Sequence, residues 1–305
     1  AQESIFGVFQ RALMVKINNW LDAVNGACAG AVGKTATAPL DRVKLVLQNQ
    51  ELAVGRAASS QLTGLLDALK SLSQEKGGFS ALWRGNATNV ARIVPTYAAR
   101  FWLYGRCEEM CPAHLQADAR RLCAGALAGA GALLLTHPLD TMRTRLAASR
   151  VFADELAYRG LIDCCTATWR QEGIRGFYAG CAVSLLEIAP YTAISFAGYE
   201  GLKQRLRHTK HGRKFAQPFA GLVSGAVATT VCYPLDTLRR QLMLEGARGY
   251  EARYERSFIK CCTILWLEGG LKRFYRGWSV TLLKSVPTIA ITFVVNDSLK
   301  ELCAG

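Results

Sequence analysis

The chain has 305 residues and a formal net charge of +14 at pH 7, and half of its residues are hydrophobic while a fifth are charged. This composition is rich in apolar residues for a soluble chain but poor for a chain embedded wholly in lipid. The basic residues lie mainly between apolar runs instead of forming one patch, which excludes nucleic acid as the expected partner and favours an anionic membrane surface and a small anionic solute.

Six apolar segments decide the class. Each is long, rich in apolar or small residues, and close to the roughly 20 residues that span about 30 Å of hydrocarbon. Several contain one internal charge, which is costly in lipid and is therefore expected to face a bundle interior or a water-filled cavity. We expect an all-α membrane protein with six transmembrane helices in the lipid bilayer. The segments are residues 18–40, 86–105, 121–140, 181–200, 217–235 and 278–296.

An element of the form Pro-x-Asp-x-x-basic ends the first, third and fifth segments. Its prolines lie 99 and 96 residues apart, and a repeat of this length outranks other signals. We expect three pseudosymmetric repeats, residues 1–115, 116–211 and 212–305, which form one transmembrane domain with a short amphipathic helix between the two spans of each repeat. The copies are Pro39, Asp41 and Lys44; Pro138, Asp140 and Arg143; and Pro234, Asp236 and Arg239.

Two glycine patterns recur in the same phase. A GxxxG pair ends nine residues before each proline, at Gly30, Gly129 and Gly225, and this spacing lets neighbouring helices approach closely. The stretches "GGFSALWRGN", "EGIRGFYAG" and "EGGLKRFYRG" then place an aromatic residue near a glycine before each even-numbered span. Such phased recurrence of individually weak patterns supports the threefold repeat.

The proline elements predict a gate. Proline removes a backbone hydrogen bond and bends a helix, and the aspartate and the basic residue three positions later share one helical face. A single copy is also explained by stabilisation of a helix end at the membrane interface, but three copies favour a ring of ion pairs that closes one end of the bundle. The expected pairs are Asp41 with Arg143, Asp140 with Arg239, and Asp236 with Lys44.

With these elements in three copies, the sequence resembles the mitochondrial carrier family over essentially its whole length. The resemblance implies a six-helix bundle around a central cavity, a matrix-side gate braced by Gln48, and solute exchange by alternate opening of two faces. It also implies cardiolipin binding at the short amphipathic helices and a location in the mitochondrial inner membrane, with a plastid membrane as the alternative. The stretches "RGNATNVARIVP", "SLLEIAPYTAISF" and "CYPLDTLRRQ" are most similar to adenine nucleotide carriers, including the plant and algal organellar type.

Three charged residues, Arg92, Glu187 and Lys284, each precede a proline of an even-numbered span by three positions. Because the repeat relates them, we expect them to face the cavity at a similar depth, and their different charges indicate a site for an asymmetric solute. A cavity that contains Lys34, Arg92 and Lys284 attracts polyanions. Arginine suits bidentate phosphate contact, and lysine acts as a point charge.

The resemblance assigns further contacts to this site. It matches Lys34 and Arg92 to phosphate-contacting positions and places Ile188 and Tyr191 beside an aromatic base. Thr96 lies one helical turn from Arg92, so we expect it to add a hydroxyl contact. For Tyr191, ordinary packing in its helix is an equally good explanation. Glu187 departs from the small residue usual in nucleotide carriers, so a nucleotide-like cofactor or an amino acid stays open as the substrate.

The opposite gate is incomplete. The family pattern of an aromatic residue, an acid and a base is kept by Tyr199, Glu200 and Lys203, and its charges are kept by Asp297 and Lys300. In the first repeat, Gly105 stands where the acid belongs and Glu108 where the base belongs. The alternative function is therefore a carrier-derived structural subunit of a larger membrane complex, with reduced or no transport.

Enzymatic activity has little support. No nucleophile and base stand at a usable spacing, and the glycines lack the order needed to cradle phosphate. No CxxC occurs and the histidines show no ligand spacing, so we expect neither a cofactor nor a metal site.

Overall fold

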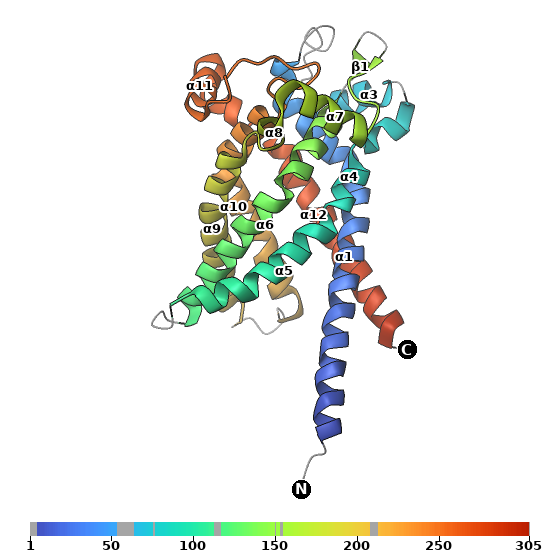
Figure 1. Ribbon diagram of the computed structural model, residues 1–305, viewed down its shortest axis with the longest axis vertical. Helices are drawn as coiled ribbons and strands as arrows, with labels where there is room; N and C mark the ends of the chain where they lie inside the picture. Colours follow the sequence, from blue (N-terminus) through green and yellow to red (C-terminus); the bar gives the residue numbers. More distant parts are fainter. Residues whose placement is uncertain are drawn as a thin grey trace.

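The computed structural model describes residues 5–53, 64–75, 77–112, 117–149, 151–152, 155–207 and 213–304. Three long helices contain the proline elements, and we call them the proline helices. Each is followed in the chain by further long helices that return in the opposite direction. The short elements gather at one end of the bundle, which is the top in Figure 1 and is called here the closed end. The proline helices are α1 (Ile5–Asn49), α6 (Ala117–Ala148) and α10 (Arg213–Leu244).

The remaining elements complete each repeat. The long helices of the even-numbered spans are α4 (Asn86–Ala91) with α5 (Ile93–Met110), α9 (Cys181–Arg207) and α12 (Trp278–Ala304). The short elements are η1 (Gln50–Leu52), α3 (Leu65–Ser73), η2 (Gly78–Trp83), the antiparallel pair β1 (Val151–Phe152) and β2 (Glu155–Leu156), α7 (Leu161–Glu172), α8 (Ile174–Phe177) and α11 (Phe258–Phe274).

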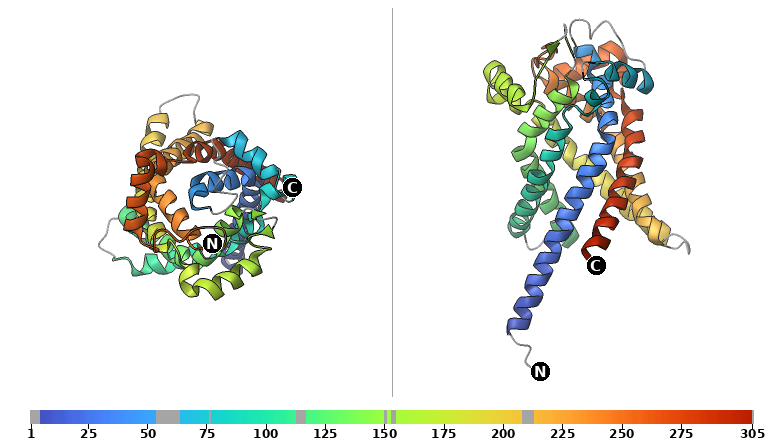
Figure 2. Two further views of the ribbon diagram at one scale, coloured as in Figure 1. Left: turned by 90° about the horizontal axis from the view of Figure 1, so that it is seen from above. Right: turned by 90° about the vertical axis from the view of Figure 1, so that its right-hand side faces the viewer.

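The long helices close into a ring. The most extensive contacts join α5 to α6, α9 to α10, and α12 back to α1, so the second span of each repeat packs against the proline helix of the next. Seen from above, the helices surround a common axis (Figure 2). This cyclic order is the threefold arrangement that the repeated sequence predicts, and the all-α fold class is confirmed.

Two segments of the described chain are long and apolar enough to cross a membrane by composition alone, residues 174–205 and 278–296. The other predicted spans fall short of that hydropathy because small and charged residues interrupt them. In α6, for example, His137 and Asp140 lie within the apolar run and line the interior cavity. Charges that face inward lower the mean hydropathy without exposing a charge to lipid.

The second predicted span is interrupted at one residue. Arg92 separates α4 from α5 with φ −70° and ψ −22°. Pro95 follows three positions later and has no N–H to donate to the carbonyl group of Ala91, which loses its helical partner. Arg92 itself keeps helical dihedral angles, and α9 and α12 are continuous at Pro190 and Pro287, so the interruption is a local loss of hydrogen bonding and not a change of helix direction.

Glycines mark the close approaches between repeats, but they are not the GxxxG glycines. A Cβ on Gly30 or Gly225 would meet no atom within 4 Å, and one on Gly129 would lie 4.0 Å from the Ile188 side chain. A side chain on Gly85 would meet the backbone of Ala147 at 2.9 Å, and one on Gly180 would meet the carbonyl oxygen of Arg239 at 2.7 Å. These two approaches lie at the closed end, where even-numbered spans begin. Farther along the bundle, a side chain on Gly33 would meet the Thr292 hydroxyl at 2.5 Å, and one on Gly131 would meet Leu103 at 2.8 Å.

Candidate functional site

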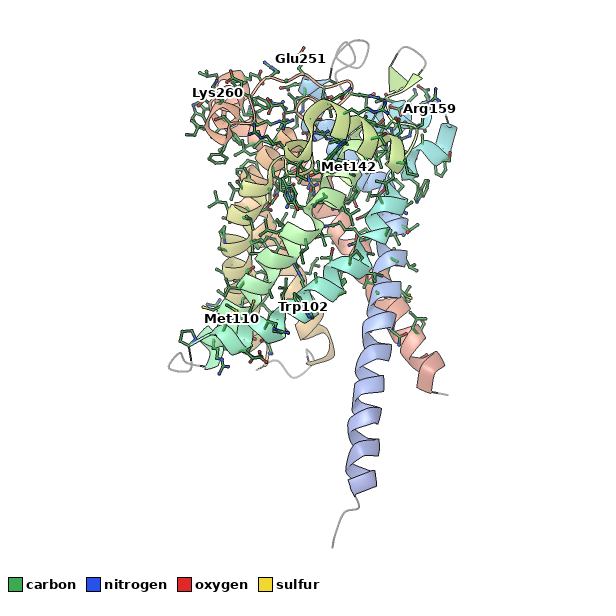
Figure 3. All side chains as sticks on the ribbon, viewed as in Figure 1. Trp102, Met110, Met142, Arg159, Glu251 and Lys260 are labelled. Carbon is green, nitrogen blue, oxygen red and sulfur yellow. The ribbon has the colours of Figure 1, made fainter. Side chains whose placement is uncertain are left out.

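A cavity of about 450 Å³ lies inside the ring of helices. Side chains from all three repeats line it, and many of them are polar or charged. Arg92, Glu187 and Lys284, the three residues related by the repeat, all line this cavity, as the sequence predicts. Figure 3 shows how side chains fill the bundle from Met142 near the closed end to Trp102 and Met110 at the far end.

Two of the three predicted gate pairs are present. Lys44 Nζ lies 2.6 Å from Asp236 Oδ2, and both residues are buried. Arg143 Nη2 lies 3.2 Å from Asp41 Oδ2. These pairs join α1 to α10 and α6 to α1, so they hold proline helices of different repeats together at the closed end.

The third gate pair differs from the prediction. Asp140 contacts Arg240, at 3.8 Å, instead of Arg239. Arg239 pairs with Asp236 at 2.8 Å and with Glu187 Oε2 at 3.1 Å. The physical reason is that Glu187 supplies a second carboxylate next to Asp236, which draws Arg239 away and leaves the adjacent arginine to hold Asp140.

Gln48 joins two proline helices beside the gate. Its side-chain Nε2 donates to the hydroxyl of Thr237 at 2.9 Å, and the Gln241 side chain donates to the Gln48 carbonyl oxygen at 2.8 Å. Thr237 in turn donates to the carbonyl oxygen of Phe274 at 2.6 Å. The position of Gln48 is therefore that of a brace between α1 and α10.

Each of the three cavity residues also contacts a gate residue. Arg92 lies 3.7 Å from Asp140 Oδ1, Lys284 pairs with Asp41, and Glu187 pairs with Arg239 as described above. The three cavity residues and the gate therefore form one network. An anion that binds Arg92 or Lys284 competes with the gate carboxylates for these cations.

The other predicted contacts divide into two groups. Thr96, Ile188 and Tyr191 line the cavity, and the Thr96 hydroxyl donates to the Arg92 carbonyl oxygen at 2.8 Å. Lys34 does not line this cavity but is half-buried on α1, near enough for the charges of Arg92 and Asp41 to act on it. Lys34 is thus a neighbour of the phosphate-binding candidates.

At the far end, Lys203 and Glu200 form an ion pair of 3.4 Å within α9, and the ammonium group of Lys203 lies 5.3 Å from the centre of the Tyr199 ring. The side chains of Asp297 and Lys300 lie outside the described residues. The pair at this end joins residues of one helix, in contrast to the gate pairs at the closed end.

Two arginines of this region, one in the gate and one in the cavity wall, were missed in the sequence. Arg240 is adjacent to Arg239 in "LRRQ", and the second arginine was the available signal. Arg100 also lines the cavity, and its signal was the spacing of four that it shares with Thr96 and Arg92 along one helix.

A ring of spanning helices around a charged cavity, closed at one end by ion pairs, is the architecture of a membrane carrier with a central site. The family model described as "Mitochondrial carrier protein" matches residues 15–115, 117–210 and 212–305. The chain belongs to the mitochondrial carrier family, whose members are transporters.

Curated relatives agree with this assignment. The chain is 34% identical to the thylakoid ADP,ATP carrier protein of Arabidopsis thaliana over 92% of its own length and 65% of the relative's length. It is 34% identical to mitochondrial carrier protein CoAc2 of Zea mays, over 90% of this chain and 84% of the relative. It is also 34% identical to ADP/ATP translocase 3 of Homo sapiens, over 92% of this chain and 96% of the relative.

Proposed function

We propose that this protein exchanges adenine nucleotides, or a related phosphorylated anion, across an organellar inner membrane by alternating access. The observation that carries the proposal is that Arg92 and Lys284 line one cavity and are each held by a gate carboxylate, Asp140 and Asp41. The similarity to ADP/ATP carriers of Arabidopsis thaliana and Homo sapiens supports the same substrate class.

Binding and gating are coupled in this proposal. A phosphate group that binds Arg92 bidentately and Lys284 as a point charge takes both cations from Asp140 and Asp41. The gate then loses two contacts that hold its acids in place, so its barrier falls only when substrate is bound. Ile188 and Tyr191 offer the apolar and aromatic surface that a base needs, and both face the cavity.

Location and lipid partner are part of the proposal. We place the protein in the mitochondrial inner membrane, with a plastid membrane as the alternative, and we place cardiolipin at the short amphipathic helices. Exposed apolar side chains on α7 and α11 support lipid contact there, notably Ile162, Trp169, Ile259 and Trp266.

Uptake into liposomes that contain the purified protein tests the proposal. Labelled ADP, ATP, AMP, phosphate and amino acids are offered with and without the same compound inside. Saturable uptake of a nucleotide that requires internal substrate is the expected result. Uptake of amino acids alone would indicate that the substrate is an ammonium-bearing solute, which the carboxylate of Glu187 can bind.

The incomplete far gate favours one alternative function. Gly105 has no carboxylate to offer, and among the described contacts Glu108 is engaged through its backbone carbonyl oxygen, which accepts from Arg120 at 2.8 Å. If folded protein transports none of these compounds, the structural subunit of a larger membrane complex becomes the better explanation.

A further inference from the structure

Arg100 gives the cavity a second cationic level. It lines the same cavity as Arg92 and follows it by eight residues in α5, which is about 12 Å along a helix axis. Arg100 is exposed and, within the described part of the chain, makes no ion pair or hydrogen bond. In Figure 3 its helix is the one that carries the labelled Trp102.

The two levels differ in how their charges are satisfied. Arg92 and Lys284 already contact the gate carboxylates Asp140 and Asp41. Arg100 has no such neighbour among the described side chains, so a ligand anion at this level does not compete with a described carboxylate for this cation. Arg100 is therefore the cation of this cavity that is most available to an incoming anionic group.

The charge of Arg100, which is farther from the closed end than that of Arg92, also breaks the threefold symmetry. The spacing that relates Arg92 to Glu187 and Lys284 relates Arg100 to Ser195 and Thr292, which are uncharged. The Thr292 hydroxyl donates to the carbonyl oxygen of Thr288 at 2.7 Å. Among the three positions that the repeat relates at this level, Arg100 alone offers a charge to an anionic group of a ligand.

The base-binding candidates lie between the two levels. Thr96 lies one helical turn from Arg92 and one turn from Arg100. Tyr191 occupies the equivalent position in the second repeat. Thr192, next to Tyr191, also lines the cavity. A nucleoside at this middle level directs the phosphate chain on one side of its ribose toward Arg92 and leaves the other side of the ribose facing Arg100.

We propose that Arg100 binds a second phosphate carried by the ribose of the substrate, apart from the phosphate chain that Arg92 and Lys284 hold. The substrate class is then a nucleotide with a further phosphate on the 2′ or 3′ hydroxyl of its ribose, or a larger cofactor built on one, and adenosine 3′,5′-bisphosphate is the probe for this class. This inference rests on the proposed nucleotide exchange and narrows it. The planar guanidinium fork of arginine matches the oxygens of such a phosphate.

Uptake into liposomes of adenosine 3′,5′-bisphosphate and of ADP, measured at one ionic strength, tests the inference. Arg100→Gln is compared with Arg106→Gln, a control on the same helix whose guanidinium lies 5.8 Å from the Trp102 ring and does not line the cavity. Loss of one charge-assisted phosphate contact is expected to raise the KM for the bisphosphate about tenfold in Arg100→Gln and to change the KM for ADP less than about twofold. Arg106→Gln is expected to behave as the unsubstituted protein.

Three outcomes overturn the inference. Equal losses for both nucleotides in Arg100→Gln would show that Arg100 only attracts anions through its field. Uptake of ADP without uptake of the bisphosphate would remove the second phosphate site while leaving nucleotide exchange intact. Uptake of neither compound by folded protein would overturn both this inference and the proposed function.

Discussion

Glu187 on α9 and Arg239 on α10 form an ion pair of 3.1 Å, and this pair replaces the Asp140–Arg239 contact that the repeated proline elements predict. The carboxylate of a cavity residue thus decides which arginine completes the gate. Because Glu187 pairs with Arg239, which lines the same cavity, we expect its charge to lower the affinity of the cavity for phosphate groups.

Substitution of Glu187 is therefore expected to change substrate preference. Glu187→Gly removes the carboxylate and opens space, and Glu187→Gln removes the charge at nearly constant volume. Both remove one of the two carboxylates that hold Arg239 and leave Asp236 as its partner. We therefore expect uptake of ADP and ATP relative to AMP to rise about tenfold, which corresponds to about 1.4 kcal/mol. Competition between labelled and unlabelled nucleotides in liposomes measures this ratio.

Glu187→Asp is the control for this prediction, because it keeps the charge on a shorter side chain and is expected to keep the original preference more closely. An unchanged substrate profile in both neutral variants would exclude Glu187 as the residue that discriminates between substrates.

Arg92→Ala is expected to lower uptake about 100-fold. Two charge-assisted hydrogen bonds to phosphate contribute about 3 kcal/mol together, and the variant loses both. The fold is expected to survive, since Asp140 keeps Arg143 at 3.9 Å and Arg240 at 3.8 Å as partners. Uptake and apparent melting temperature of the same preparation check the two halves of the prediction.

Arg106→Ala serves as its matched control, because Arg106 is an exposed arginine of the same helix outside the cavity lining. Normal uptake by Arg92→Ala would remove Arg92 from the binding site, and equal losses in the two variants would indicate a general effect of positive charge.

The pair of Lys44 and Asp236 gives a prediction about stability. Removal of one partner from a buried pair costs about 3–5 kcal/mol because the other charge stays buried. Asp236 retains Arg239 and Arg240 when Lys44 is lost, whereas Lys44 loses its 2.6 Å partner when Asp236 is lost. We therefore expect Asp236→Asn to lower the melting temperature more than Lys44→Gln, and the double variant to be less destabilised than the sum of both.

A thiol-reactive dye measures these melting temperatures. Burial raises the pKa of the Cys164 thiol to about 12, so this thiol of α7 reacts slowly while the protein is folded and rapidly once it unfolds. Strict additivity of the two single substitutions would show that Lys44 and Asp236 do not stabilise each other.

Much of this architecture is present in the sequence. The phased proline elements predict the three repeats and two gate pairs, because a local pattern that recurs with a period fixes equivalent places in space. The phase also brings Arg92, Glu187 and Lys284 to one cavity. These predictions need only the repeat and the helical period.

The parts that the sequence does not predict depend on contacts between distant segments. Arg239 and Arg240 are neighbours in the chain, and only the approach of Glu187 from another helix decides which of them meets Asp140. The GxxxG pattern likewise marks a surface that permits close approach, but a Cβ on any of these glycines would meet nothing nearer than 4.0 Å, and the tightest contacts lie at other glycines, such as Gly180.

Gly180 provides the last prediction, since it begins α9 against the backbone of α10. Its φ of +72° is unfavourable for residues other than glycine. In addition, a Cβ there would lie 2.7 Å from the Arg239 carbonyl oxygen. Gly246, at φ +73°, has open space around it and shares only the backbone cost. We expect Gly180→Ala to destabilise the protein by about 3 kcal/mol or more and Gly246→Ala by about 1 kcal/mol. The melting temperature of Gly180→Ala should therefore fall well below that of Gly246→Ala, and equal shifts would show that the contact between α9 and α10 at this point tolerates a side chain.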